Sequence, residues 1–462
     1  MSPPDQRILI LDFGSQTTML IARRIRELRV YSEIWPCTSS FEAIAAFAPA
    51  GIVLSGGPAS VYDDDAPGVD PALFEMGVPI LGICYGAQLM CARLGGQVLA
   101  SNEREYGASR IVIDLPRGVL AGFAPGVAEP VWMSHGDRID QVPPGFDVLA
   151  RSDGGIVAAV ADTERRFFGL QFHPEVVHTP GGRAMLSDFV IEVCGCTPTW
   201  TMARFVDTAV AAIRAQVGEG RVLCGLSGGV DSSVTAALLH RAIGDRLTCV
   251  LVDNGLLRKG EAADVKKIFG DGMGLPLVVV DASETFLGQL AGIIDPERKR
   301  KIIGNAFIEV FDAAAAATGE VYDFLAQGTL YPDVIESVSF RGPSATIKSH
   351  HNVGGLPDHM KMTLVEPLRE LFKDEVRVLG RELGLPGNLV DRQPFPGPGL
   401  AVRIVGEVTP ERARLVREAD AIVRAELEAW PGHGVLWQYF CVLLPVQSVG
   451  VMGDKRTYEA TA

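Results

Sequence analysis

The chain has 462 residues, a length that suggests about three domains. Its 42 basic and 56 acidic residues give a net charge of −14, which argues against nucleic acid or an anionic membrane surface as the main partner. Apolar residues make up 47% of the chain, and no uninterrupted apolar run reaches membrane-spanning length. Eight scattered cysteines form no Cys-x-x-Cys pair and no signal peptide is visible, so we expect a cytoplasmic protein with reduced thiols.

The first part of the chain alternates strand-like and helix-like segments. Residues 8–11 form a short apolar run, and apolar residues at helical spacing follow between positions 20 and 28. Two further strand-like runs cover 52–54 and 78–83. This alternation predicts a doubly wound parallel sheet of the α/β class, with ligands at the carboxyl ends of its strands.

The third of these units carries a candidate nucleophile. Gly82-Ile83-Cys84-Tyr85-Gly86 has the Gly-x-nucleophile-x-Gly form of a strand-to-helix elbow, with cysteine in place of serine. The glycines permit the sharp turn, and the helix start favours a thiolate. The backbone N–H groups of Tyr85 and Gly57 are candidates for holding a developing oxyanion. The alternative is a buried cysteine that only packs.

A cysteine nucleophile needs a base and a group that orients the base, and His173-Pro174-Glu175 offers both. Pro174 favours an extended His173, and residues two apart in an extended run share a side. A surface turn is the alternative for such a tripeptide. Together with the elbow, the pattern predicts a Cys-His-Glu triad.

Gly-Ile-Cys-Tyr-Gly together with Phe-His-Pro-Glu resembles the class I glutamine amidotransferases, which hydrolyse glutamine through a cysteinyl thioester. The resemblance implies Cys84 as nucleophile, His173 as base and then acid, and Glu175 as the orienting carboxylate. It further implies an oxyanion hole at Gly57 and Tyr85, and glutamine contacts from Gln88, Ser134 and His135. We assign this domain to residues 1–199.

The pattern restarts after the first domain. A strand at 222–226 runs into Ser227-Gly228-Gly229, and a helix follows at 231–243. Such a turn directs free backbone N–H groups and the positive end of a helix dipole at one point. No Gly-Lys-Ser/Thr ending is present, which excludes the kinase-type P-loop, and an ordinary capped glycine turn is the alternative.

This loop resembles the PP-loop of enzymes that split ATP into AMP and pyrophosphate. The resemblance implies ATP or pyrophosphate contacts from Ser227, Gly228, Gly229, Val230, Asp231, Ser232 and Ser233, with Asp253 and Lys373. Asp253 ends the next predicted strand, where ribose or adenine contacts fall, although a solvated turn carboxylate is the alternative. Lys373 opens a later predicted helix and is either a point charge for pyrophosphate or a surface residue.

Residues 295–301 form a dense charge run on a predicted helix. The run is either a solvated helix face or a mobile basic lid over phosphates. In the lid interpretation Arg300 reaches the acceptor substrate.

An amidotransferase followed by this PP-loop in one chain resembles the GMP synthetase family. Further matching segments are 253–255, 327–337, 347–356, 395–400 and 449–454. The resemblance implies that ATP with Mg²⁺ adenylates the C2 oxygen of XMP, and that ammonia from glutamine displaces AMP to give GMP. The implied small-molecule partners are glutamine, ATP and XMP, with no organic prosthetic group, and no metal ligands are identified.

The resemblance also sets the remaining domains. We predict an ATP pyrophosphatase domain at 200–392 and an incomplete small α/β dimerisation domain at 393–462, because family members continue for several dozen residues. We therefore expect a truncated chain, which bears on XMP binding and on the homodimer that the family forms. The alternatives are another glutamine-dependent adenylating ligase, for instance one acting on a deamido-NAD-like acid, or a form that retains only glutaminase activity or nucleotide binding.

Overall fold

The computed structural model describes residues 6–337, 362–452 and 455–462. The matching segment 347–356 therefore lies outside the described residues, as does the end of the segment 449–454. The chain forms two compact units, with the division between Arg204 and Phe205, close to the boundary that the sequence predicts near residue 199.

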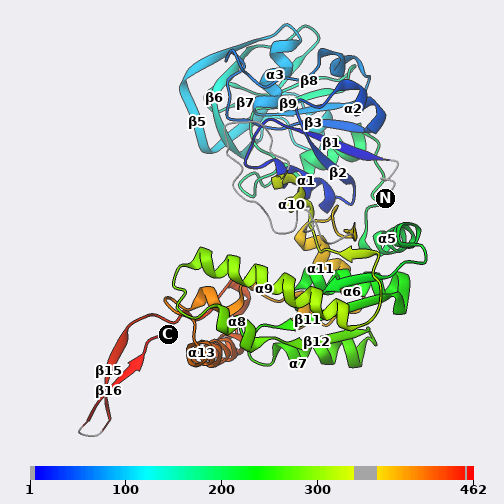
Figure 1. The fold of residues 1–462 in the computed structure, drawn as a ribbon. Helices are drawn as coiled ribbons and strands as arrows, with labels where there is room; N and C mark the ends of the chain where they lie inside the picture. Colours follow the sequence, from blue (N-terminus) through cyan, green and yellow to red (C-terminus); the bar gives the residue numbers. More distant parts are fainter. Residues whose placement is uncertain (1–5, 338–361, 453–454) are drawn as a thin grey trace. The chain divides into compact units, whose positions relative to one another are not determined.

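The first unit is built on one nine-stranded sheet in the order β2-β1-β3-β4-β9-β8-β7-β5-β6 (Figure 1). The strands are β1 (Arg7–Asp12), β2 (Tyr31–Pro36), β3 (Gly51–Leu54), β4 (Ile80–Ile83), β5 (Gln97–Ile113), β6 (Ala128–Gln141), β7 (Asp147–Ser152), β8 (Val157–Asp162) and β9 (Phe167–Leu170). Strands β2, β1, β3, β4 and β9 run parallel, and β8, β7, β5 and β6 continue the sheet antiparallel.

The parallel half of this sheet confirms the predicted strand–helix alternation. Its helices include α1 (Thr18–Glu27), α2 (Phe41–Phe47), α3 (Tyr85–Arg93) and α4 (Gly182–Ser187). The strands β1, β3 and β4 are fully or almost fully buried, as expected for strands that are covered on both faces. The antiparallel half is an addition that the strand–helix alternation did not predict, because its strands follow one another without intervening long helices.

The second unit contains a five-stranded parallel sheet in the order β12-β11-β10-β13-β14. Its strands are β10 (Val222–Gly225), β11 (Leu247–Asp253), β12 (Leu277–Asp281), β13 (Phe324–Ala326) and β14 (Thr363–Val365). Its helices include α6 (Val230–Ile243), α7 (Glu261–Val265), α8 (Ser283–Gln289), α9 (Pro296–Ala317), α10 (Tyr331–Ser337), α11 (Lys373–Glu382), α12 (Gly387–Val390) and α13 (Pro410–Ala429); α5 (Met202–Val217) begins at the end of the first unit. The predicted parallel α/β architecture is confirmed here as well.

The segment after residue 393 packs into the core of the second unit. Leu400, Val416 and Leu443 share one buried cluster with Leu223 of β10 and Val250 of β11. Beyond this cluster, β15 (Gln447–Met452) and β16 (Lys455–Ala460) pair as a separate antiparallel ribbon. The division into three domains stays a prediction, since the core is continuous across the predicted boundary at 392.

Within the described part of the chain, no helix combines the length and the apolar character that crossing a membrane requires.

Candidate active sites

Cys84 occupies a strained turn between β4 and α3. Its φ of 50° is positive, a conformation that side chains rarely adopt and that recurs at functional sites. A Cβ at Gly82 would lie 2.6 Å from the backbone nitrogen of Ala87, and one at Gly86 would collide with the carbonyl oxygen of Leu54. The two glycines of the predicted elbow are therefore required by the close approach of the backbone.

His173 and Glu175 lie side by side after β9. His173 Nδ1 is 2.7 Å from Glu175 Oε1, and the Glu175 side chain is fully buried. Burial disfavours the imidazolium, but hydrogen bonds and charge attraction from Cys84 and Glu175 outweigh this and raise the pKa of His173 to about 10. The structure thus brings the three predicted triad residues together, with His173 between the thiol and the carboxylate.

Two predicted oxyanion donors border the same turn. Among the described residues, neither the Gly57 nor the Tyr85 backbone N–H donates to a protein acceptor. The Tyr85 group is the first N–H of α3, which has no acceptor within its own helix. A Cβ at Gly57 would lie 2.8 Å from the carbonyl oxygen of Phe13, so only glycine fits there. Both N–H groups are therefore available to a ligand.

The predicted glutamine-binding residues lie on β6, which carries Ser134 and His135, and on α3, which carries Gln88. Gln88 Nε2 donates to the Asp137 carbonyl at 2.9 Å, and His135 Nδ1 contacts the same carbonyl at 3.0 Å. The Cys84 thiol donates to the Ser134 carbonyl at 3.5 Å. Gln88 and His135 are buried and hold the backbone that Ser134 presents to the cysteine. Burial lowers the pKa of His135.

Sequence reasoning missed three residues at this site. Thr17 Oγ1 donates to Glu175 Oε1 at 2.7 Å, Gln171 Nε2 lies 3.9 Å from Cys84 Sγ, and Glu105 Oε2 lies 3.3 Å from His135 Nε2. Thr17 follows β1 at the carboxyl edge of the parallel strands, and that position is the signal that could have found it.

In the second unit, the predicted PP-loop connects β10 to α6. Gly228 has a φ of 72°, and Ser232 Oγ accepts the Ser227 backbone N–H at 3.2 Å while donating to the Gly229 carbonyl at 3.1 Å. Lys373 Nζ is 2.5 Å from Asp231 Oδ2. The structure therefore brings Lys373 to the loop from α11, although 142 residues separate it from Asp231.

The other residues that we predicted to contact the nucleotide are buried or form contacts within the protein. Ser233 is buried, and its backbone N–H donates to the Gly229 carbonyl. Val230 is also buried. Asp253 ends β11, caps its own turn by accepting the Gly255 N–H at 2.9 Å, and lines a cavity of about 470 Å³. Arg300 lies on α9 and pairs with Glu297 at 2.9 Å on an exposed face. Their roles stay predictions.

The charge run at 295–301 is a regular part of α9. Asp295 caps this helix by accepting the Arg298 N–H at 2.8 Å. Lys299 is buried and its Nζ donates to the carbonyls of Ala401, Ile404 and Gly406. The interpretation of a fully solvated face is wrong at Lys299, because the helix turns this residue toward the C-terminal segment.

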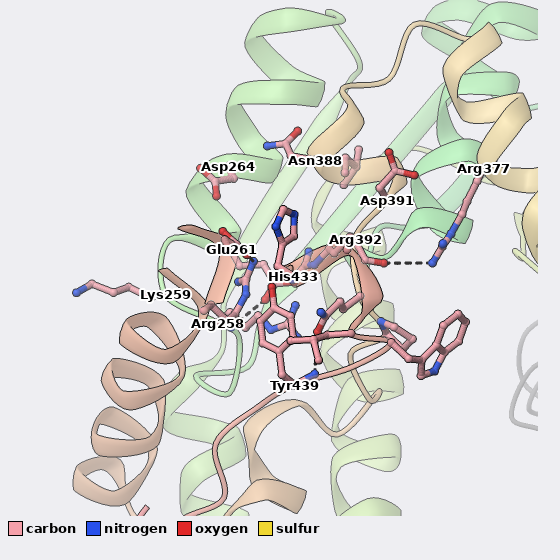
Figure 2. A pocket seen from close by; sticks show the side chains of 18 of the residues that line it. Arg258, Lys259, Glu261, Asp264, Arg377, Asn388, Asp391, Arg392, His433 and Tyr439 are labelled. Atoms are coloured by element: carbon pink, nitrogen blue, oxygen red, sulfur yellow. Dashed lines mark hydrogen bonds and ion pairs between the residues drawn. The ribbon is translucent and has the colours of Figure 1, made fainter. Parts of the chain in front are cut away.

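A pocket of about 760 Å³ with charged side chains of both signs lies in the second unit, between α7, α12 and the end of α13 (Figure 2). Its charged and polar lining includes Arg258, Lys259, Arg377, Arg392 and Arg424, with Glu261, Asp264, Asp391 and Glu428. None of these residues was predicted as a site residue. Among the described residues, no group of three or more histidine, cysteine, aspartate or glutamate side chains is placed to hold a metal ion.

Comparison with known proteins finds matches to family models in parts of both units. Residues 9–193 match the glutamine amidotransferase class-I family, 201–286 match the NAD synthase family and 425–462 match the GMP synthase C-terminal domain.

Three relatives are similar to this chain over almost its whole length. All are named glutamine-hydrolysing GMP synthase. The relative from Phenylobacterium zucineum is 58% identical over 98% of this chain and 88% of its own length. Those from Zymomonas mobilis and Brucella suis are 57% and 56% identical, each over 98% of this chain and 87% of the relative. With the cysteine elbow in one unit and the PP-loop in the other, this similarity shows that the chain belongs to the family of glutamine-hydrolysing GMP synthases.

Proposed function

We propose that the protein makes GMP from XMP, using glutamine as the nitrogen source and ATP, with its Mg²⁺, as the activating substrate. The observation that carries the proposal is the presence, in one chain, of the Cys84–His173–Glu175 arrangement and a PP-loop joined by Lys373. The first supplies ammonia and the second forms an adenylated acceptor. The relative from Phenylobacterium zucineum, named glutamine-hydrolysing GMP synthase, matches 98% of this chain. Residues 425–462 also match the GMP synthase C-terminal domain.

In the first reaction, the Cys84 thiolate attacks the carboxamide carbon of glutamine. The N–H groups of Gly57 and Tyr85 stabilise the negative oxygen of the tetrahedral intermediate. His173, held by Glu175, gives its proton to the departing nitrogen, so that ammonia and a thioester form. A water molecule then hydrolyses the thioester with His173 as base, which releases glutamate and regenerates the thiolate.

In the second reaction, the C2 oxygen of XMP attacks the α-phosphorus of ATP and pyrophosphate leaves. The backbone N–H groups of the PP-loop and the Lys373 ammonium hold the departing pyrophosphate. Ammonia then adds to C2 and AMP departs with its oxygen, which gives GMP. Adenylation is needed because an unactivated enol-like oxygen is a poor leaving group.

Asp231 fits a role toward the Mg²⁺ that accompanies ATP. Its Oδ1 is buried and has no hydrogen-bond partner among the described residues, while Oδ2 pairs with Lys373. Mg²⁺ is bound in such sites by one or two carboxylates together with the substrate phosphates. Bound there, the ion would neutralise charge on the pyrophosphate.

We also propose a homodimer formed through the C-terminal segment, and a cytoplasmic location. Val435 is 82% exposed and Trp437 77% exposed, and Val449 and Tyr458 of the β15–β16 ribbon are also exposed. Apolar surface of this kind supports a protein contact. The eight cysteines are all free thiols, which supports a reducing compartment.

The experiment that tests the proposed function measures AMP release with XMP and ATP, using either glutamine or an ammonium salt. We expect AMP with both nitrogen donors. In Cys84→Ala, glutamine-dependent synthesis should fall by about three orders of magnitude or more, while ammonia-dependent synthesis continues. Cys91→Ala, in the helix α3 that follows Cys84 but outside the triad, serves as the control. Absence of XMP-dependent AMP release from the unmodified protein would contradict the proposal.

A further inference from the structure

A buried ion pair lies directly against the PP-loop. Arg392 Nη1 donates to the Gly228 carbonyl at 2.8 Å, and its other terminal nitrogen pairs with Glu261 Oε1. The Glu261 side chain is 3% exposed and that of Arg392 is 15% exposed. Arg392 and Gly228 are 164 residues apart in the chain, so this contact exists only in the folded second unit.

Glu261 is itself held in one position. Its second oxygen, Oε2, accepts the backbone N–H of Arg258 at 2.8 Å at the beginning of α7. Both carboxylate oxygens are therefore used, one by the backbone and one by Arg392. Because the carboxylate cannot rotate without losing a bond, it fixes the guanidinium, and the guanidinium fixes the Gly228 carbonyl.

The position of this carbonyl sets the direction of an anion-binding N–H group. In a trans peptide the carbonyl of residue 228 and the N–H of residue 229 point in opposite directions. Arg392 holds the carbonyl on one side, so the Gly229 N–H points to the other, toward the Ser227 hydroxyl at 3.4 Å. Gly228 permits this orientation because its φ is 72°, and a Cβ there would lie 3.2 Å from both Glu261 Oε1 and Val265 Cγ2.

We propose that Arg392, held by Glu261, is a positioning residue for pyrophosphate recognition, which it supports by fixing the Gly228–Gly229 peptide of the PP-loop. This inference rests on the proposed function, because it assumes that the PP-loop binds the pyrophosphate part of ATP. Arg392 also lines the 760 Å³ pocket (Figure 2). Its hydrogen bond to the Gly228 carbonyl links the 391–394 segment to the PP-loop.

The test uses Arg392→Lys in the full chain. Lysine keeps the charge but lacks the planar fork that contacts a carbonyl and a carboxylate at once. We expect the affinity for magnesium pyrophosphate, measured by calorimetric titration, to fall by about tenfold or more, a loss of about 1.4 kcal/mol. The KM for ATP should rise, while glutaminase kcat of the first unit stays unchanged.

Arg381→Lys is the matched control, because Arg381 pairs with Asp391 in the same unit but both side chains are about half exposed. We expect wild-type pyrophosphate affinity from it. A folded Arg392→Lys variant that binds pyrophosphate like the wild type would overturn the inference. If Arg392→Lys does not fold, Glu261→Gln decides in the same titration, because it keeps the shape of the side chain but removes the charge that holds Arg392.

The same titration separates the two proposals. A wild-type protein that fails to bind magnesium pyrophosphate or ATP contradicts the assignment of the PP-loop as the ATP site. A wild-type protein that binds pyrophosphate, with Arg392→Lys binding equally well, contradicts only the positioning role.

Discussion

At the scale of single residues, the glutaminase site depends on a buried charge arrangement. Glu175 is almost completely buried, and its Oε1 accepts from both Thr17 and His173. A buried carboxylate is costly unless it is paired and hydrogen bonded, and Oε1 meets both conditions, whereas Oε2 is buried without a hydrogen-bond partner among the described residues. Against the opposing effect of burial, hydrogen bonds and charge attraction from Cys84 and Glu175 raise the pKa of His173 to about 10, which keeps it protonated at neutral pH and matches its role as the acid that releases ammonia.

This arrangement predicts a pH-dependent stability. The folded pKa of His173 is about 10 and its ordinary value is 6.5, so protonated His173 stabilises the fold fully below about pH 6.5, and this contribution disappears as the pH rises through about 10. We expect Glu175→Gln to lower the free energy of unfolding most below about pH 6.5, and progressively less as the pH rises toward about 10.

Urea unfolding of the first unit at several pH values measures this difference. Glu164→Gln is the control, because Glu164 is exposed in the turn between β8 and β9 of the same unit. A destabilisation by Glu175→Gln that is constant with pH would contradict the raised pKa of His173.

At the scale of elements, close contacts with backbone atoms determine which residues can form the elbow between β4 and α3. The elbow between β4 and α3 requires two glycines, since a Cβ at either would meet backbone atoms, which cannot move aside as a flexible side chain can.

On α9, one charged residue of the run at 295–301, Lys299, faces inward while its neighbours face solvent. The helix period decides this, because a helix that packs on one face buries about every third or fourth residue.

Gly86→Ala should destabilise the first unit, because the new methyl group collides with the Leu54 carbonyl. We expect a loss of about 1–3 kcal/mol or more in the free energy of unfolding, together with loss of glutaminase activity. Gly122→Ala, where a Cβ meets only Asp188 Oδ2 at 3.7 Å, should be tolerated. Equal stability of the two variants in urea would show that the elbow can relax.

Lys299→Met should destabilise the second unit. The change leaves the carbonyls of Ala401, Ile404 and Gly406 without their common donor in a buried site. We expect a loss of about 2 kcal/mol or more, since each unsatisfied buried group has a desolvation cost. Lys301→Met, on the exposed side of the same helix, should change stability by less than about 0.5 kcal/mol. Similar losses in both variants would contradict the anchoring role of Lys299.

At the scale of the whole molecule, each compact unit has a core of its own. One buried cluster is confined to the first unit and contains residues of β1, β3 and β4, while another joins β10 and β11 to the segment after residue 393. The net charge of −14 opposes the binding of phosphate groups. Phosphate binding therefore depends on the local geometry of the PP-loop.

Separate cores predict separate unfolding. We expect calorimetry to resolve two transitions, with Gly86→Ala lowering the melting temperature of one and Lys299→Met that of the other. For units of this size a change of 1 kcal/mol shifts the midpoint by about 2–4 °C. If each variant shifted both transitions equally, the units would unfold cooperatively and this expectation would be wrong.

The sequence by itself determined the features whose functional residues lie close together in the chain. The elbow around Cys84, the His173–Glu175 pair and the PP-loop each lie within a few residues, so spacing and residue type predict their local geometry. The parallel strands that present them were predictable from short buried runs for the same reason. The sequence also predicted the joining of the triad, because a cysteine nucleophile needs a base and the base needs an orienting carboxylate.

Only the tertiary structure decided the contacts between distant segments. Thr17 meets Glu175 across 158 residues, Arg392 meets Gly228 across 164, and Lys299 meets Gly406 across 107. Nothing in the local pattern around Arg392 or Lys299 distinguishes it from a surface residue, and only its position after β1 marks Thr17. A polar side chain acquires its role from the groups that packing brings within hydrogen-bond distance. The motifs can therefore be recognised in the sequence, while the residues that hold them in position cannot.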